Sequence, residues 1–400
     1  MTLSLIKYEN PVCLVCGNDG SGTHFGVQTC RACAMFFRRS QSQQTLFQCK
    51  KHSKFCDIHV AEHRLMCKSC RLKKCQEVGM SWEKKLSTKE PIDTLPEFIQ
   101  TNLTMNFSER VEYCVWHPIT IKPARWIDIG PIIRRSRTIL EEFHPPSTSR
   151  FQSLNALQRM TYSLKKLRSG QNFNPKFEEF MTFDDYFSHW EEFMTRCAEW
   201  LMHSNQFLEL PVQERLQIFK IVWAVFRRFE RSSMSARVFG QRCLDEKIML
   251  ISDDSAGRFD EFILDVSDIC GIGFDQYRNR FRNHIILYFD VVSRPCIDWE
   301  FTDMEINFAL CQIVWSYASR KLLGQTLQAG DAFLAEISEN LHDYYRNDMK
   351  LKNYATRLKV LMEMVNNVLK VQQQHEQTLE MAFLFDMFNV ITSEPAFFSV

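Results

Sequence analysis

Nine of the fifteen cysteines lie within one short stretch, between residues 13 and 75. Two Cys-x-x-Cys pairs form a first set of four, and a third pair completes a second set with two single cysteines. Four thiolates on short spacings are the ligands that zinc prefers in structural sites. The sequence therefore predicts two structural Zn²⁺ ions, with these ligands: Cys13, Cys16, Cys30, Cys33, Cys49, Cys56, Cys67 and Cys70.

A disulfide framework and an iron-sulfur site are the alternatives for these cysteines. No apolar segment typical of a signal peptide precedes Pro11. We therefore expect a reducing compartment, where clustered cysteines bind metal instead of pairing. Each set supplies all four ligands of a tetrahedral ion, and no Glu lies nearby in a His-x-Glu pattern, so we expect the zinc to be structural and not catalytic.

Two helices are expected to follow the ligand pairs. The stretch from Cys30 to Ser40 contains no Gly or Pro, which predicts a helix held at its first turn by two metal ligands. Residues 67–78 predict a second helix that ends at Gly79, a common C-terminal cap. The ninth cysteine, Cys75, shares one face of that helix with two apolar side chains, so we interpret it as a small buried residue.

Charge is distributed unevenly along the chain. Residues 13–85 contain thirteen Lys and Arg against five Asp and Glu, a difference of +8, whereas the whole chain has a net charge of +1. The remainder must therefore carry −7. A basic module that presents a helix fits the major groove of DNA. The alternative is that these basic residues only solvate a small module.

These residues resemble the DNA-binding domain of nuclear hormone receptors. The resemblance covers the eight ligand positions, residues 22–27, Phe36-Phe37-Arg38-Arg39-Ser40 and Cys67-Lys68-Ser69-Cys70-Arg71-Leu72-Lys73-Lys74-Cys75. It implies that the helix from Cys30 is the recognition helix on double-stranded DNA. The DNA-contacting residues carried over by the resemblance are Arg31, Ala32, Ala34, Arg38, Arg39, Arg64, Arg71 and Lys74.

Two departures affect what the resemblance implies. Arg31 and Ala34 stand where the family commonly has Glu and Lys, which changes the hydrogen-bonding groups offered to base edges. The loop between Cys49 and Cys56 holds six residues where five are usual, and the family makes dimer contacts there. Such substitutions are typical of the divergent nematode branch of the family. Half-site sequence, half-site spacing and the choice between monomer, homodimer and heterodimer are therefore left open.

The chain from Phe151 onward predicts helices. Apolar residues recur at helical spacing, and residues 216–229 are apolar on every face, as in a helix buried between other layers. A short hairpin is expected near Ile248–Ile251. We therefore predict an all-α, three-layer helical sandwich. The stretch from Trp200 to Trp223 resembles the signature of nuclear-receptor ligand-binding domains, which implies a pocket lined by Cys197, Trp200, Leu201, Trp223 and Phe226; plain core packing is the alternative for each.

The C-terminal stretch Phe383–Phe388 resembles the family's terminal activation helix, with Asp386 as its acidic residue. An ordinary C-terminal helix packed on the core is the alternative. In the family, the acidic residue and an opposing Lys bind the two ends of a coactivator's Leu-rich helix. The resemblance thus implies a coactivator or corepressor site made of Lys220, Leu384, Asp386, Met387 and Phe388.

Four segments are expected. They are a short N-terminal tail at 1–12, a DNA-binding domain at 13–80 with zinc fingers at 13–33 and 49–70, a hinge with a short helix at 81–149, and a ligand-binding domain at 150–400. The tail is too short for a long activation segment, so we expect any activating surface elsewhere. No apolar run approaches eighteen residues, so we expect no membrane span.

The combined prediction is a nuclear, zinc-dependent, sequence-specific transcription factor that regulates RNA polymerase II and is controlled by a small lipophilic ligand. A ligand-independent receptor is the alternative, followed by a zinc-based protein-interaction adaptor. An enzyme is disfavoured, because the chain shows no Gly-rich phosphate loop, no catalytic Cys/His spacing and no carboxylate pair.

Overall fold

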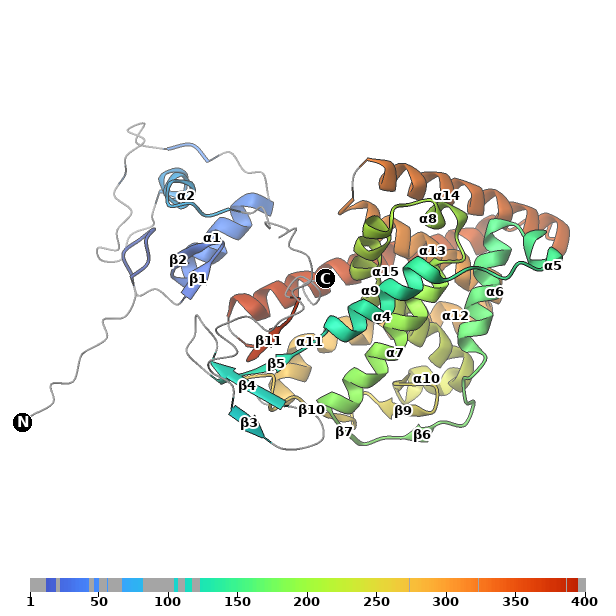
Figure 1. Cartoon of the computed structure of the whole chain (residues 1–400), viewed down its shortest axis with the longest axis horizontal. Coiled ribbons are helices and arrows are strands. Elements are labelled where there is room, and N and C mark those ends of the chain that lie inside the picture. Colours follow the sequence, from blue (N-terminus) through green and yellow to red (C-terminus); the bar gives the residue numbers. More distant parts are fainter. Residues whose placement is uncertain are drawn as a thin grey trace, which may run out of the picture. The chain divides into compact units, whose positions relative to one another are not determined.

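The computed structural model describes residues 12–18, 22–42, 47–49, 56, 67–81, 104–106, 112–116, 123–272, 274–322, 324–385 and 387–394 (Figure 1). The chain forms two compact units. The first contains Met1–Arg125 with Met381–Asn389, and the second contains Trp126–Glu380 with Val390–Val400.

The zinc module of the first unit consists of a hairpin and two helices. Strands β1 (Gly22–His24) and β2 (Val27–Thr29) pair antiparallel through a two-residue turn at Phe25 and Gly26. Both turn residues have positive φ, and glycine adopts that backbone without strain. Helices α1 (Arg31–Ser42) and α2 (Lys68–Glu77) each begin within a ligand pair, as the sequence predicts. The rest of the described first unit includes the antiparallel pair β3 (Thr104–Asn106) and β4 (Glu112–Trp116).

The second unit is mainly helical, which confirms the predicted all-α class. Its helices are α4 (Gly130–Glu142), α5 (Ser149–Gln152), α6 (Ala156–Arg168), α7 (Phe183–Leu201), α8 (Asn205–Leu208), α9 (Val212–Phe239), α10 (Gln241–Asp245), α11 (Phe274–Tyr288), α12 (Arg294–Trp299), α13 (Asp303–Ser319), α14 (Gln325–Asp343) and α15 (Ala355–Leu384), with π-helical turns η1 (Phe289–Ser293) and η2 (Tyr344–Asp348).

Helix α9 lies at the centre of this unit. It packs against α4, α7 and α13, and α13 packs in turn on α6 and α14. Most residues of α9 between Leu216 and Ala236 are buried. Apolar side chains lie on all faces of the helix, so each neighbouring helix packs against an apolar surface. Helix α13 is buried in the same way from Glu305 to Trp315. The helix predicted to be buried on all sides is therefore confirmed.

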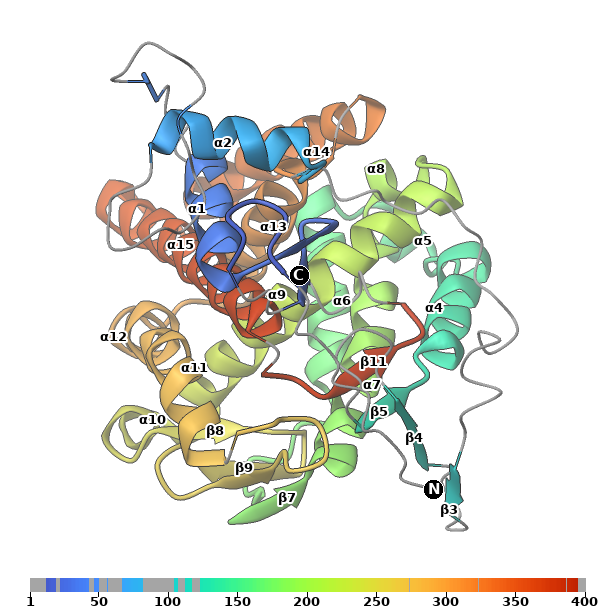
Figure 2. The ribbon, with the colours of Figure 1, turned by 90° about the vertical axis from the view of Figure 1, so that its left-hand side faces the viewer.

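Short strands connect the helices. β8 (Ile248–Leu250) pairs antiparallel with β9 (Ser255–Arg258), which confirms the predicted hairpin, and β6 (Lys176–Phe177) pairs parallel with β9. β7 (Phe180–Thr182) pairs parallel with β10 (Ile263–Asp265). β11 (Val390–Thr392) lies beside β5 (Pro123–Ile127), as both ribbon views show (Figures 1 and 2).

The second unit begins earlier than the expected boundary near residue 150. Helix α4, which we assigned to a hinge, contributes Ile132, Ile133 and Leu140 to the main hydrophobic core. Pro131 does not interrupt the helix, because it occupies the first turn, where its missing N–H has no partner to lose. Among the described residues, no helix combines the length and the apolar character needed to cross a bilayer.

Candidate zinc centres and nucleic-acid interface

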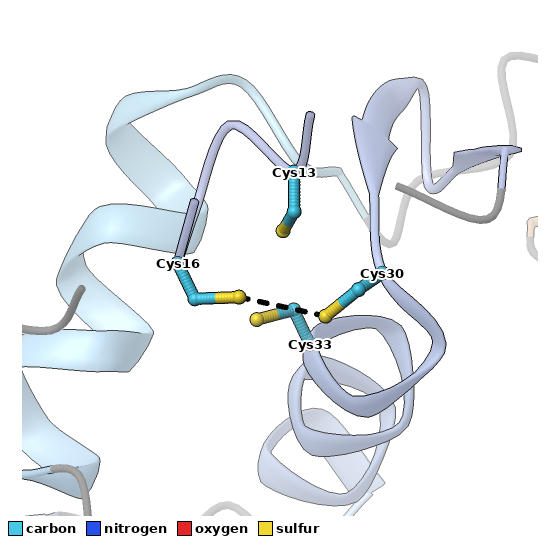
Figure 3. Close-up of side chains that lie close together, drawn as sticks. All are labelled: Cys13, Cys16, Cys30 and Cys33. Atoms are coloured by element: carbon cyan, nitrogen blue, oxygen red, sulfur yellow. Dashed lines mark hydrogen bonds between the residues drawn. The ribbon is translucent and has the colours of Figure 1, made fainter. Parts of the chain in front are cut away.

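The sulfur atoms of Cys13, Cys16, Cys30 and Cys33 converge on one point (Figure 3). All four lie within 4.8 Å of one another, and the Sγ atoms of Cys16 and Cys30 are 3.5 Å apart. A zinc ion with bonds of about 2.3 Å places tetrahedral sulfurs roughly 3.8 Å apart, so the arrangement fits zinc. The first predicted ligand set is confirmed as a cluster able to hold one ion.

The second set is grouped in the same way. The Sγ atoms of Cys49 and Cys56 are 3.6 Å apart, and Cys70 Sγ lies 3.8 Å from Cys49 Sγ, with Cys67 completing the group. None of the nine cysteines in this region forms a disulfide, so that alternative is excluded for them. Cys75 belongs to neither cluster and is fully buried, as predicted.

The electrostatics of the first cluster favour a cation. Burial raises the pKa of the Cys16 thiol to about 11, whereas a hydrogen bond from Cys33 lowers the pKa of Cys30 to about 4. The protein alone therefore stabilises one thiolate at the expense of its neighbours. A divalent ion removes this conflict, because it binds all four sulfurs in their ionised form.

The zinc ligands fix where helix α1 begins. The Cys33 and Ala34 N–H groups donate to the Cys30 carbonyl, so two ligands lie in the first turn. Phe36 and Phe37 anchor the inner face in the module's core. Arg31, Ala32 and Arg39 are exposed on the other side, and Arg38 is half-buried. Of the predicted DNA-contacting residues on α1, solvent can therefore reach Arg31, Ala32, Arg39 and part of Arg38.

Two residues of the predicted DNA-contacting set, Ala34 and Arg71, are turned toward the interior of the zinc module. Ala34 is completely buried, because it lies one turn before Phe37 on the inner face of α1. Arg71 points inward: its Nη2 donates to Cys33 Sγ at 3.2 Å, and its guanidinium lies 4.7 Å from the centre of the Phe36 ring. Lys74 is half-buried on α2, and Arg64 lies outside the described residues.

The predicted pocket residues are packed against one another within the main core. Cys197, Trp200, Leu201 and Phe226 are each at most 1% exposed, and Trp223 is 5% exposed. The ring centres of Trp200 and Phe226 are 5.1 Å apart, and Trp200 Nε1 donates to Asn307 Oδ1. These side chains fill the region in which the sequence places a pocket.

The expected separate terminal helix is absent from the described residues. Helix α15 continues to Leu384, because no Gly or Pro interrupts its apolar stripe, and the described residues after it form strand β11 at Val390–Thr392. Met387 is buried and Phe388 half-buried, while Asp386 lies outside the described residues. Lys220, the other end of the expected coactivator site, lies half-buried on α9.

Sequence reasoning missed a buried ion network between α6, α9 and the β8–β9 turn. Glu230 is fully buried and accepts from Arg168 Nε at 3.0 Å and Arg231 Nε at 2.6 Å, and Arg231 also reaches Asp253. Burial alone would raise the pKa of Glu230, but the two guanidinium groups hold it below its usual value. The adjacent charged pair Glu230-Arg231, directly after the stretch 216–229 that was predicted to be buried on every face, was the available signal.

Comparisons with known proteins match both units. A model described as the double treble clef zinc finger, C4 type, matches residues 11–82, and one described as the ligand-binding domain of nuclear hormone receptor matches residues 171–385. Three Caenorhabditis elegans proteins are similar over most of their length. Nuclear hormone receptor family member nhr-54 is 42% identical over 100% of this chain and 99% of its own, member nhr-213 is 31% identical over 94% and 91%, and member nhr-127 is 30% identical over 89% and 95%.

Proposed function

The chain belongs to the nuclear hormone receptor family, and from this premise we propose that it binds specific DNA sequences in the nucleus and regulates transcription by RNA polymerase II. The observation that carries the proposal is the placement of α1. Two zinc ligands hold its first turn, and Arg31 and Arg39 are exposed along it. A helix of this width fits the major groove, and Arg is the side chain best suited to guanine edges.

Fewer residues of this chain support contacts with DNA than the family pattern implies. Ala34 is buried and Arg71 binds a zinc thiolate, so neither supports a DNA contact. We assign base reading to Arg31, with Ala32 beside it, and backbone contacts to Arg38, Arg39 and Lys74. Arg31 replaces an acidic residue common in the family, so the half-site should contain a guanine where other members read cytosine.

Control by partners is favoured over control by a ligand. Trp200, Phe226 and their neighbours fill the expected pocket, which supports a constitutive or partner-driven receptor. A ligand sensor would require these side chains to move apart. The test is thermal unfolding of the full chain across a panel of fatty acids and sterols, combined with organic extraction of the purified protein. A co-purified lipid, or a rise in unfolding temperature with one panel compound, would reverse this preference.

DNA reading is tested by selecting bound sequences from a random duplex pool with the full chain. We expect one enriched half-site, which Arg31→Ala relaxes at a single base at a cost of roughly 1 to 3 kcal/mol. Arg280→Ala, at an exposed position of α11, is the matched control and should leave the half-site unchanged. An equal loss of affinity for all sequences with Arg31→Ala would assign Arg31 to phosphate contact and contradict the reading role.

A further inference from the structure

Strands β7 and β10 form a small sheet with one face turned outward. They lie at the lower rim of the helical unit in Figure 1 and pair in parallel, with Phe180 directly beside Ile263. Met181 and Leu264 are buried, whereas Phe180 is 56% exposed and Ile263 is 47% exposed, as expected when side chains alternate along a strand. Single exposed apolar side chains are common on proteins, but an adjacent pair on one face is a candidate contact site.

The backbone beside this pair can also form hydrogen bonds with another chain. Within the part of the protein that the structure describes, β7 and β10 make a sheet of two strands, so each strand has one edge without a strand partner. Such an edge presents N–H and C=O groups that an extended segment can pair with. The exposed face and the open edges together favour an extended partner segment over a helix.

An acidic hollow adjoins Ile263. Its volume is ≈ 530 Å³, and its walls include Ile263, Phe274, Asp260, Glu261, Asp275 and Arg278. Sites that enclose a small ligand measure about 300–1,000 Å³, so the hollow has room for a long side chain. Three carboxylates and one guanidinium give these walls a net negative charge, which favours a cationic side chain.

The carboxylates of the hollow remain accessible to a partner. Asp260, Glu261 and Asp275 each lie near an Arg side chain, at 2.7, 3.5 and 3.0 Å, but the three acidic side chains are 47%, 63% and 82% exposed. Exposed ion pairs contribute little free energy, and a carboxylate accepts hydrogen bonds from more than one donor. A second cation can therefore bind there, whereas a second copy of this chain would bring like charges together.

We propose that Phe180, Ile263 and the acidic hollow, here called the β7–β10 face, bind an extended segment of a partner protein in which apolar residues alternate with Lys or Arg. The backbone of the segment pairs with an open strand edge. An apolar side chain covers Phe180 and Ile263, and a cationic side chain enters the hollow. DNA reading uses α1 and none of these residues, so this inference and the proposed function can fail separately.

The test measures binding of a short fluorescein-labelled peptide, in which Val and Lys alternate, to the full chain by anisotropy. Phe180→Ser and Ile263→Ser should each weaken binding roughly fivefold to tenfold, because an apolar contact at the centre of the interface is lost. Phe173→Ser is the matched control, since Phe173 is 60% exposed but lies outside the sheet, and it should leave the affinity unchanged.

The charge of the hollow is tested with Glu261→Gln. This change should weaken binding roughly threefold at low salt and reduce the dependence of the affinity on salt concentration, because one exposed attraction is removed. Glu363→Gln is the control, since Glu363 is a similarly exposed carboxylate that pairs with Lys359 on α15. It should change neither quantity.

Several results would overturn the proposal. Absence of binding, or an affinity that neither Phe180→Ser nor Ile263→Ser changes, would show that the β7–β10 face is not the site. Equal binding of a peptide in which Val and Glu alternate would show that the carboxylates take no part. A dimer of the full chain in analytical ultracentrifugation that Ile263→Ser dissociates would assign the face to a second copy of this chain.

Discussion

At the scale of single residues, Arg71 shows how a basic side chain can serve the metal instead of DNA. Its guanidinium donates to Cys33 Sγ and stacks on Phe36, so it links α2 to the zinc cluster from which α1 begins. A cation beside a zinc thiolate stabilises the ionised sulfur and orients it. The side chain therefore supports the recognition helix indirectly.

We expect Arg71→Ala to weaken zinc binding roughly tenfold to a hundredfold, the usual effect of removing a group bonded to a metal ligand. Competition with a chromophoric chelator measures this. Lys73→Ala is the control, because Lys73 is an exposed residue of the same helix paired with Glu77. Two results together would instead assign Arg71 to a phosphate contact. They are an unchanged zinc affinity and a fall of about one in the slope of log DNA affinity against log salt concentration.

The sequence could identify the eight zinc ligands but not the role of Arg71. Thiolate spacing is a local property, so Cys13 to Cys70 are predicted correctly as two sets. The direction in which Arg71 points depends on how α2 packs against α1, since Cys33 is 38 residues away in the chain. The burial of Ala34 could not be predicted for the same reason, because it depends on which face of α1 is turned inward.

At the scale of elements, α13 and α14 approach each other closely at Gly330. A Cβ atom added to Gly330 on α14 would lie 2.9 Å from Cε3 of Trp315 on α13. Glycine normally weakens a helix interior, so its presence here is explained by the close approach of the indole ring. The sequence shows a glycine within an apolar stripe but cannot show which side chain lies opposite.

We expect Gly330→Ala to destabilise the helical unit by about 1 to 3 kcal/mol, although the same change in an open helix stabilises by up to about 1 kcal/mol. Urea unfolding monitored by helical circular dichroism measures it. Combining it with Trp315→Phe, which removes the opposing ring atoms, should give less than the summed cost of the two changes. A stabilising effect of Gly330→Ala alone would contradict the predicted clash.

The N-terminal end of α13 is stabilised by a second element-level feature. Thr302 and Glu305 form a capping box, a Thr-x-x-Glu pattern visible in the sequence. Glu305 also accepts from Arg357 of α15 and from the Tyr345 hydroxyl. Burial alone would raise the pKa of Glu305, but the bond from Arg357, together with Thr302 and Tyr345, holds it below its usual 4.5.

A carboxyl whose pKa is lowered by folding stabilises the fold above its unfolded pKa and loses that contribution as the pH falls through the folded value. We therefore expect Glu305→Gln to cost about 3 kcal/mol at neutral pH, because Arg357 loses its carboxylate partner. The difference in unfolding free energy between this variant and the unchanged protein should shrink as the pH falls below 4.5. Urea unfolding of the helical unit over this range tests it, and a pH-independent difference would contradict the assignment.

At the scale of the whole molecule, the zinc module and the helical unit each have a main hydrophobic core of their own, so we expect their stabilities to differ. The core of the zinc module consists mainly of metal ligands and a few aromatic residues, whereas the helical unit has a large apolar core around α9. The sequence predicts this division through its cysteines and its charge of +8 over residues 13–85. It cannot show that α4 belongs to the helical unit, because that depends on the contacts of α4 with α7 and α9.

Chelation should release two zinc ions per chain and abolish DNA binding, since structural zinc contributes on the order of 10 kcal/mol to a module of this size. The helical unit should keep its thermal transition, because its core contains no metal ligand cluster among the described residues. Atomic absorption, DNA retardation and circular dichroism of one sample measure these effects. Retention of DNA binding in excess chelator would contradict them.

The position of Ser393 has a consequence for chain connectivity. By bonding to both Ile127 and Ile129, it brings the last described turn of the helical unit next to its first strand. Neighbouring ends allow a domain to be circularly permuted. A short linker from residue 394 to residue 126, with new ends opened at the exposed Phe173, would keep every helix in its place while reversing which part of the unit is synthesised first.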